Sequence, residues 1–299
     1  MAAESIAVAT AGVVRRQAVR SSVWLDYWAL TKPEVNLLIV ITTAAAFCMA
    51  RPHSLVSVPL SRLLHTLVGT LLVASGAATL NQWLERPFDA RMRRTARRPV
   101  AGGRIPAAHA LLFGVLLSLA GIGQLWFAAG PVPSLLALAT LVSYLFLYTP
   151  LKRISPLCTL IGAVPGAAPP LIGWTATGAP LDRDAWMLWA ILFLWQLPHF
   201  MAIAWMYRDD YERAGYFVLP RGEPRAHFVT LQTLLPLLGL ILVTVPFGAA
   251  ALLLNLAFFY FGLRFVLEGT GAAARRLLLG SIVYLPALLA LGIVLRLLR

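Results

Sequence analysis

Long apolar segments recur along this chain of 299 residues, and short polar or charged segments separate them. A helix needs roughly 20 apolar residues to cross a hydrocarbon layer about 30 Å thick. Because lipid offers no hydrogen-bond partners, a single segment that crosses it must be helical, so that its backbone groups bond to one another. The pattern predicts an all-α, polytopic membrane protein with about nine transmembrane helices. We expect these helices at 34–52, 63–84, 107–128, 132–149, 156–176, 185–206, 227–246, 248–266 and 277–297.

Composition supports a membrane protein and argues against a nucleic-acid binder. Hydrophobic residues make up 60% of the chain and charged residues 12%, whereas soluble domains average about 25% charged residues. The net charge of +13 comes from basic residues near the ends of apolar segments, and not from one soluble face. We therefore expect the lipid bilayer as the surroundings and no nucleic acid as a partner.

The distribution of basic residues predicts an orientation. Lysines and arginines are concentrated in the loops after the second, fourth, sixth and eighth expected helices, and such loops usually face the cytoplasm. We expect residues 1–30 to form a cytoplasmic N-terminal arm and residues 31–299 to form a single transmembrane domain. The short arm favours the bacterial inner (plasma) membrane over the mitochondrial inner membrane.

A first cluster of polar residues closes the second expected helix. Asn81, Glu85 and Asp89 are spaced four residues apart, so on a helix they share one face. Pro87 introduces an alternative, because its ring can kink or end the helix before Asp89. Two carboxylates and an amide oxygen suit Mg²⁺, which binds few protein ligands together with substrate phosphates. The stripe therefore predicts a catalytic Mg²⁺ site for a diphosphate substrate.

Arginines follow this cluster directly. The Arg94 and Arg98 guanidinium groups have the planar fork that binds phosphate oxygens, so we expect both to contact substrate. An ordinary charged cytoplasmic loop is the alternative, and it explains the arginines through topology. It does not explain carboxylates at the membrane end of a helix, where charge is costly.

A second cluster follows the sixth expected helix. Asp209 and Asp210 are adjacent, so a helix would point them about 100° apart and only one need face a site. We expect Asp210 to be a catalytic residue and metal ligand, Asp209 to lie nearer solvent, and Tyr207 to contact substrate. A solvated zwitterionic loop explains this segment equally well.

Four further residues are candidates for substrate binding. Lys32 precedes the first expected helix, and Lys152 and Arg153 close the fourth. Each of these is either a topology charge or a partner for a phosphate or propionate group. His199 lies inside the apolar sixth helix, where its imidazole could ligate an iron porphyrin, act as a base, or hydrogen-bond a neighbouring helix.

Taken together, these segments resemble the UbiA superfamily of intramembrane prenyltransferases, and within it the branch that farnesylates haem. The most specific piece is the run Met92-x-Arg94-Thr95-x-x-Arg98-Pro99. The remaining segments of the resemblance are Thr31 to Pro33, Asn81 to Pro99, Tyr148 to Arg153, Gly162 to Trp174 and Pro198 to Pro220. The resemblance implies a helix bundle around a central cavity, with Asn81, Glu85 and Asp89 in the first Mg²⁺–diphosphate motif and Asp210 in the second.

The resemblance also implies a reaction. The expected substrates are farnesyl diphosphate and haem b, the product is haem O, and haem A synthase or terminal oxidase assembly proteins are possible partners. One alternative is an aromatic acceptor such as a quinone precursor or chlorophyllide. Another is a transporter, although transporters usually place ionisable residues near the bilayer midplane, whereas these lie at helix ends.

Overall fold

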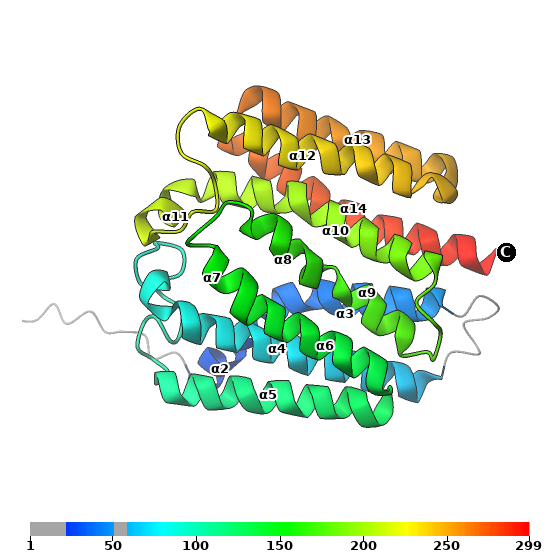
Figure 1. Ribbon diagram of the computed structural model, residues 1–299, viewed down its shortest axis with the longest axis horizontal. Coiled ribbons are helices and arrows are strands. Elements are labelled where there is room, and N and C mark those ends of the chain that lie inside the picture. The colour runs from blue at the N-terminus through cyan, green and yellow to red at the C-terminus, as the bar shows by residue number, and fades with distance from the viewer. Residues whose placement is uncertain (1–21, 51–58, 299) are drawn as a thin grey trace, which may run out of the picture.

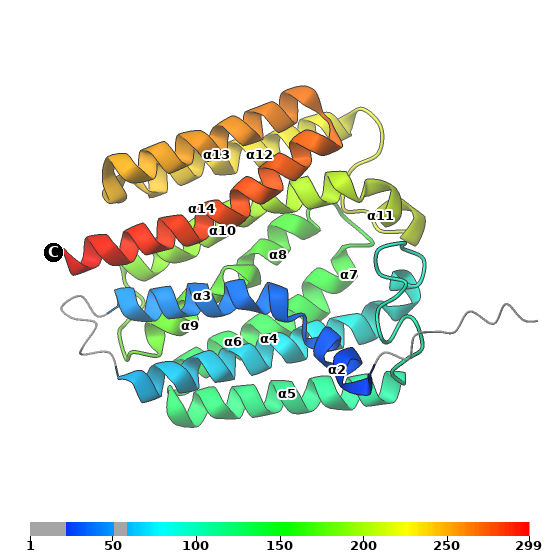
Figure 2. The same ribbon diagram turned by 180° about the vertical axis from the view of Figure 1, so that it is seen from behind.

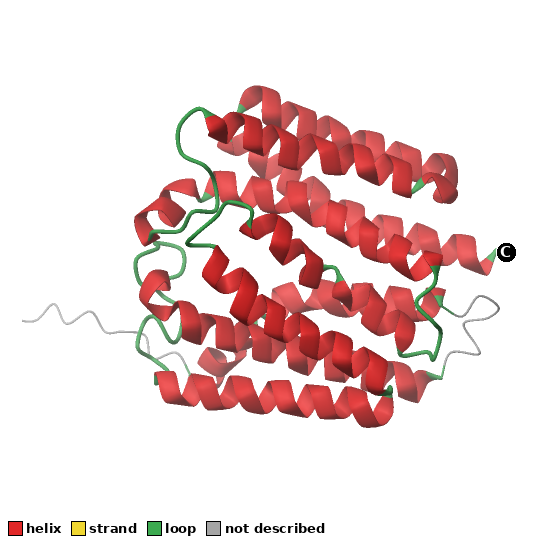
Figure 3. Cartoon of the chain, viewed as in Figure 1, coloured by secondary structure: helices red, strands yellow, loops and turns green. Residues whose placement is uncertain are grey.

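A computed structural model describes residues 22–50 and 59–298 of the chain, and all regular structure in these ranges is helical (Figure 3). Residues 1–21, the larger part of the expected N-terminal arm, lie outside the described residues. The elements are α2 (Val23–Thr31), α3 (Pro33–Met49), α4 (Leu60–Asp89), α5 (Ala107–Ala128), α6 (Pro131–Ser143), the π-helix η2 (Tyr144–Tyr148), α7 (Thr149–Leu151), α8 (Cys158–Gly166), α9 (Ala168–Thr175), α10 (Arg183–Met206), α11 (Arg208–Ala214), α12 (Pro224–Val243), the 3₁₀ turn η3 (Val245–Phe247), α13 (Gly248–Glu268) and α14 (Gly271–Leu297).

The all-α, polytopic class is confirmed, with a slightly smaller count of spans. Within the described ranges, seven helices are long and apolar enough to cross a membrane. The α2–α3 pair, bent by 42°, makes an eighth if it is one span. The expected helix at 156–176 is instead divided into α8 and α9, neither of which is long enough alone.

Prolines explain the division of that helix. Pro165 lies inside α8, and Pro169 and Pro170 lie in the first turn of α9. Each removes a backbone donor and crowds the preceding turn, so the helix changes direction at Ala167. The break at this point leaves room beside α8 and α9 in the centre of the bundle.

The long helices run side by side across the molecule, and their ends define two faces (Figures 1 and 2). The loop 90–106 and α11 lie together at one end, and the C-terminus lies at the other (Figure 1). Helices α12 and α13 form the outer layer beside α10 and α14, while α4, α5 and α6 group on the opposite side. The two sequence clusters therefore reach the same end of the bundle.

Two apolar cores hold these groups together. The larger is built around α10, α12, α13 and α14, and the smaller is built around α4, α5, α6 and α9. Close backbone contact fixes α9 against α3, because a Cβ atom at Gly173 would lie 2.1 Å from the carbonyl oxygen of Thr43. This contact holds the two helices at a distance that only glycine permits.

Candidate active site

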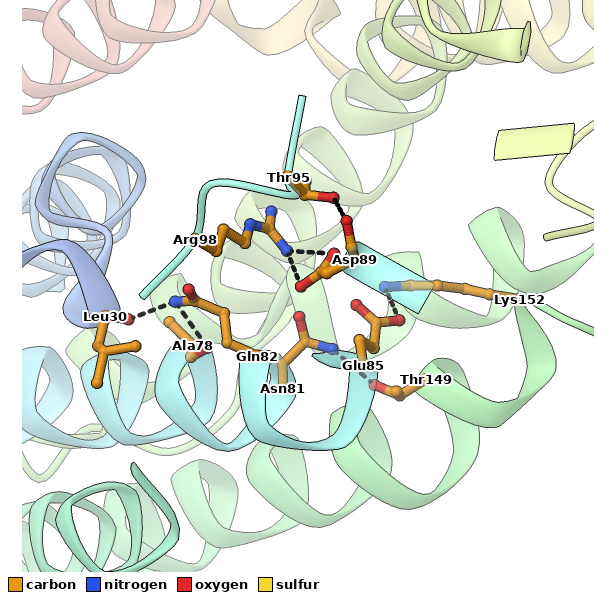
Figure 4. A network of polar contacts seen from close by, with 10 residues as sticks. All are labelled: Leu30, Ala78, Asn81, Gln82, Glu85, Asp89, Thr95, Arg98, Thr149 and Lys152. Atoms are coloured by element: carbon orange, nitrogen blue, oxygen red, sulfur yellow. Dashed lines mark hydrogen bonds and ion pairs between the residues drawn. The ribbon is translucent and has the colours of Figure 1, made fainter. Parts of the chain in front are cut away.

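The first cluster remains on one helix to its last residue. Asn81, Glu85 and Asp89 are buried, with at most 5% of each residue exposed, and they follow one another along α4 (Figure 4). Pro87 neither ends nor displaces the helix before Asp89. It cannot donate to the Trp83 carbonyl, and the Arg86 guanidinium donates to that oxygen at 2.6 Å.

Basic side chains from elsewhere in the chain form ion pairs with the carboxylates of Glu85 and Asp89. Lys152 Nζ lies 2.8 Å from Glu85 Oε1, and Arg98 Nη1 lies 2.9 and 2.7 Å from the two carboxylate oxygens of Asp89 (Figure 4). Asn81 donates its amide hydrogen to Thr149 Oγ1 at 3.2 Å, which turns the amide so that its carbonyl oxygen can accept another partner. The site is therefore charge-balanced without a ligand.

Burial and the Glu85 carboxylate together set the protonation states of Lys152 and Tyr216. Although burial acts to lower the pKa of Lys152, the Glu85 carboxylate raises it well above its usual value, so the lysine stays charged. Burial and the same carboxylate raise the pKa of Tyr216, whose phenol therefore stays protonated. The Lys152 cation beside Glu85 thus persists across the physiological pH range.

The loop 90–106 connects the first cluster to the second. The Thr95 hydroxyl donates to the Asp89 carbonyl at 2.9 Å, which fixes the loop on the end of α4. One residue earlier, the Arg94 backbone N–H donates to Asp210 Oδ2 at 3.2 Å. The Arg94 guanidinium lies over the Tyr207 ring, 4.9 Å from its centroid. The loop therefore connects the end of α4 to Asp210 and Tyr207 of the second cluster.

The second cluster is more open than the first. Asp210 has 12% of its side chain exposed, and Arg213 Nη1 lies 2.7 Å from Asp210 Oδ1. Asp209 has 79% of its side chain exposed and pairs with Arg208 at 3.6 Å, so it lies nearer solvent as expected. Although burial acts to raise the pKa of Asp210, the hydrogen bonds from Arg94 and Arg213 hold that pKa below its usual value.

The first cluster fits a shared Mg²⁺ site. Across the described ranges no three His, Cys, Asp or Glu side chains converge on one point, so the protein does not form a complete cage. Glu85, Asp89 and the Asn81 carbonyl supply the few hard oxygen ligands that Mg²⁺ takes when phosphates and water complete its shell. Asp210 is not part of one carboxylate cluster with Glu85 and Asp89.

Lys32 lines the apolar cavity in the centre of the bundle. It joins α2 to α3 in the left-handed conformation, with φ 49°. Its amino group has no ion-pair partner among residues 22–50 and 59–298. Arg153 is exposed, with its guanidinium 4.7 Å from the Phe88 ring centroid.

His199 faces a neighbouring helix. Its Nδ1 lies 2.7 Å from the Ser281 hydroxyl on α14, and its ring stacks on Trp195 at 4.9 Å. Its neighbours Gln196 and Phe200 line the central cavity, but His199 does not. A role as a haem contact therefore stays a prediction.

An apolar cavity of about 290 Å³ lies in the bundle next to the first cluster, with Ala77 and Ala78 of α4 in its lining about one turn before Asn81. We call it the chain cavity. Its lining residues come from α3, α4, α6, η2, α8, α9 and α10, and include Lys32 and the mutually stacked rings of Tyr144 and Tyr148. Sequence reasoning did not assign these tyrosines to the site. Their four-residue spacing just before Lys152, in an otherwise apolar segment, was the available signal.

The chain is similar to proteins of one family along almost its whole length. Residues 39–290 match the UbiA prenyltransferase family. A protein of Solibacter usitatus named protoheme IX farnesyltransferase is 45% identical over 282 residues, which cover 89% of this chain and 97% of that protein. The mitochondrial protoheme IX farnesyltransferase of Homo sapiens is 38% identical, over 88% of this chain and 60% of its own length.

Solved structures show the same fold. One described as digeranylgeranylglyceryl phosphate synthase matches with a TM-score of 0.73 at 14% identity, over 92% of this chain and 99% of its own. A UbiA homologue from Archaeoglobus fulgidus bound to GPP and Mg²⁺ matches with a TM-score of 0.62 at 13% identity, over 92% and 100%. With its sequence match, its fold and its stripe of buried polar residues, the chain belongs to the UbiA prenyltransferase family.

Proposed function

We propose that this protein transfers the farnesyl group of farnesyl diphosphate to a vinyl group of haem b and so forms haem O. One observation carries the proposal: buried, cation-paired carboxylates lie on the same helix as Ala77 and Ala78, which line an apolar cavity of about 290 Å³. The names of the relatives support the choice of haem as acceptor.

Asn81, Glu85 and Asp89 are the proposed ligands of Mg²⁺, with Asp210 as a further ligand on the opposite side of the diphosphate. Bound Mg²⁺ would supply positive charge that stabilises the leaving diphosphate. Lys152 and Arg98 pair with Glu85 and Asp89 in this structure. If the two carboxylates held Mg²⁺, both cations would be available to donate to diphosphate oxygens, and the ion pairs keep them in place for that role.

The remaining predicted residues complete the substrate contacts. The Lys32 amino group, which lines the chain cavity, binds the diphosphate, and Arg94 and Tyr207 border the diphosphate on the side of Asp210. Arg153 at the exposed end and His199 on α10 are the proposed contacts for the haem propionates and the haem face. These two assignments follow from the family resemblance more than from the geometry.

The chemistry then proceeds in three bond changes. The bond between C1 of the farnesyl group and the diphosphate oxygen breaks, and the diphosphate leaves with the electron pair. The terminal vinyl carbon of haem b attacks the allylic cation and forms the new carbon–carbon bond. Water adds to the resulting cationic carbon beside the porphyrin and loses a proton, which leaves a hydroxyl group. The apolar cavity excludes bulk water from the allylic cation until the new bond has formed.

We place the protein in the bacterial inner membrane, with the diphosphate site at the cytoplasmic face. The arginine-rich loop 90–106 and the basic residues of α11 lie at that end of the bundle, as cytoplasmic loops do. Haem A synthase or terminal oxidase assembly proteins are the proposed receivers of the product.

Haem extraction tests the proposal. Cells that express the chain should contain a haem b derivative with the added mass of a hydroxyethylfarnesyl group, and purified protein should release diphosphate only when Mg²⁺ is present. Diphosphate release with no modified haem would instead indicate another acceptor, such as a quinone precursor. An absence of Mg²⁺-dependent release would contradict the prenyltransferase mechanism itself.

A further inference from the structure

A second apolar hollow lies beside the chain cavity. It has a volume of about 280 Å³, and its lining comes from α4, α5, α6 and η2. We call it the outer groove. Leu80, Leu84, Leu111, Leu119, Leu138 and Leu145 are among its lining residues. It is therefore as apolar as the chain cavity and similar in size, but it lies on the other side of the contact between α4 and α6.

Among the residues that the structure describes, Leu141 is the one that lines both hollows. On α6, Ala137 and Thr140 face the chain cavity, whereas Leu138 and Val142 face the outer groove. Leu141 stands between these two faces, as its position on a helix of 3.6 residues per turn requires. It is buried, and it belongs to the same apolar cluster as Leu80 and Leu145.

The chain cavity has both small and large side chains in its lining. Ala74 and Ala77 of α4 and Ala137 of α6 are small, whereas Tyr144 and Ile172 are large. Because Leu141 belongs to the linings of both hollows, its isobutyl group contributes to the partition between them. Leu141→Ala would remove three carbon atoms from that partition.

The position of Leu141 along the bundle matches the interior of a bound isoprenoid. Thr149, which contacts Asn81, follows Leu141 by eight residues. Residues 144–148 between them form the π-helix η2, which rises less per residue than the 1.5 Å of an α-helix, so Leu141 lies less than about 12 Å deeper in the bundle than Thr149. It therefore stands beside the distal isoprene units, well away from the reacting carbon.

We propose that Leu141 determines chain-length specificity by closing the chain cavity toward the outer groove. The inference rests on the proposed function, in which an isoprenoid diphosphate occupies this cavity. A C15 chain fits in the chain cavity with Leu141 in place, while a C20 chain also needs the space of the outer groove, which lies beyond Leu141. Close packing leaves such a chain no room to pass the leucine.

Binding of substrate analogues tests the inference without turnover. The probes are the thiodiphosphate analogues of geranyl, farnesyl and geranylgeranyl diphosphate, measured with Mg²⁺ on the full chain in lipid nanodiscs. Leu141→Ala should raise the affinity for the C20 analogue relative to the C15 analogue about tenfold. Leu138→Ala removes the same atoms from the outer groove alone, so it should leave that ratio unchanged.

Two further substitutions keep the inference testable if the Leu141→Ala protein does not fold. Leu141→Val opens the partition less and should shift the ratio in the same direction by a smaller factor. Leu141→Phe fills the cavity and should favour the C10 analogue over the C15 analogue. An unchanged ratio in a folded Leu141→Ala or Leu141→Val protein overturns the inference, as does an equal shift in Leu138→Ala.

The same samples separate this inference from the proposed function. Haem O formation by the unsubstituted chain reports on the acceptor and on catalysis, whereas the analogue ratios report only on the cavity. A chain that binds the farnesyl analogue without forming haem O contradicts the proposed function, and the ratios still decide the role of Leu141. Failure of the unsubstituted chain to bind any of the three analogues overturns both.

Discussion

The two carboxylate clusters differ in how they are held. Glu85 and Asp89 have 7% and 3% of their side chains exposed, and their cations come from other segments, Lys152 and Arg98. Asp210 is paired with Arg213 one turn away on α11, and that arginine is 41% exposed. A buried carboxylate without a partner is costly, whereas a surface pair contributes little. The first cluster therefore depends on buried cations from other segments, whereas the second combines an exposed local ion pair with one backbone hydrogen bond from the loop 90–106.

The largest expected effect lies in the first cluster. Asp89→Asn removes the charge that we propose for Mg²⁺ and also the partner of Arg98. We expect diphosphate release to fall about 10³-fold, since preorganised charge at a leaving group supplies effects of this size. Radiolabelled farnesyl diphosphate and purified protein provide the measurement.

A matched substitution controls for general loss of charge. Glu268→Gln removes a surface carboxylate that pairs with Arg264 and should leave diphosphate release unchanged. Near-normal release by a folded Asp89→Asn protein would contradict the assignment of the first cluster.

The next effect concerns stability in the resting state. Lys152→Met leaves Glu85 buried without its cation, which should cost about 3 kcal/mol of folding free energy. The double variant Lys152→Met/Glu85→Gln should recover most of that loss, because no unpaired charge remains. Thermal unfolding in detergent measures both, and equal stability of the two variants would show that Glu85 does not depend on Lys152.

A smaller effect is expected in the second cluster. Asp210→Asn should lower diphosphate release about tenfold, equivalent to about 1.4 kcal/mol. Asp209→Asn should change it less than about twofold, because that side chain lies in solvent. The adjacent residue is thus a control in the same loop, and a larger loss from Asp209→Asn would reverse our assignment of the two aspartates.

The smallest effect is a dependence of stability on pH. The folded-state pKa of Asp210 lies below its usual value, so its hydrogen bonds stabilise the protein above pH about 4. That contribution is lost as the pH falls through the lowered folded-state pKa. The difference in melting temperature between the unsubstituted chain and Asp210→Asn should therefore shrink from pH 6 to pH 3, and a constant difference would contradict this.

Hydrophobic length predicted most of the fold. The expected helix at 107–128 coincides with α5, because apolar length and loop composition decide a simple span. The short helices α2 and α11 were not predicted, since each is stabilised by contacts with distant residues. One such contact is the hydrogen bond from Gln82 of α4 to the Leu30 carbonyl at 2.9 Å.

The sequence predicted only part of the site, because it shows local spacing and not contacts between distant residues. A four-residue spacing shows that Asn81, Glu85 and Asp89 share a face, and α4 confirms that placement. Spacing along one helix cannot show which distant side chain is opposite, so the pairing of Glu85 with Lys152, 67 residues away, was not foreseen. The contact between His199 and Ser281 depends on tertiary packing of α10 against α14 in the same way.

Position 32 lets backbone shape and the side chain be varied one at a time. Its φ of 49° is a conformation that glycine adopts without the penalty that a Cβ atom incurs. Lys32→Gly therefore keeps the turn between α2 and α3 while it removes the side chain, and Lys32→Val disturbs both. Loss of substrate affinity in the glycine protein would belong to the missing side chain and not to a changed turn, so this junction separates what the lining residue contributes to the cavity from what the backbone contributes to the fold.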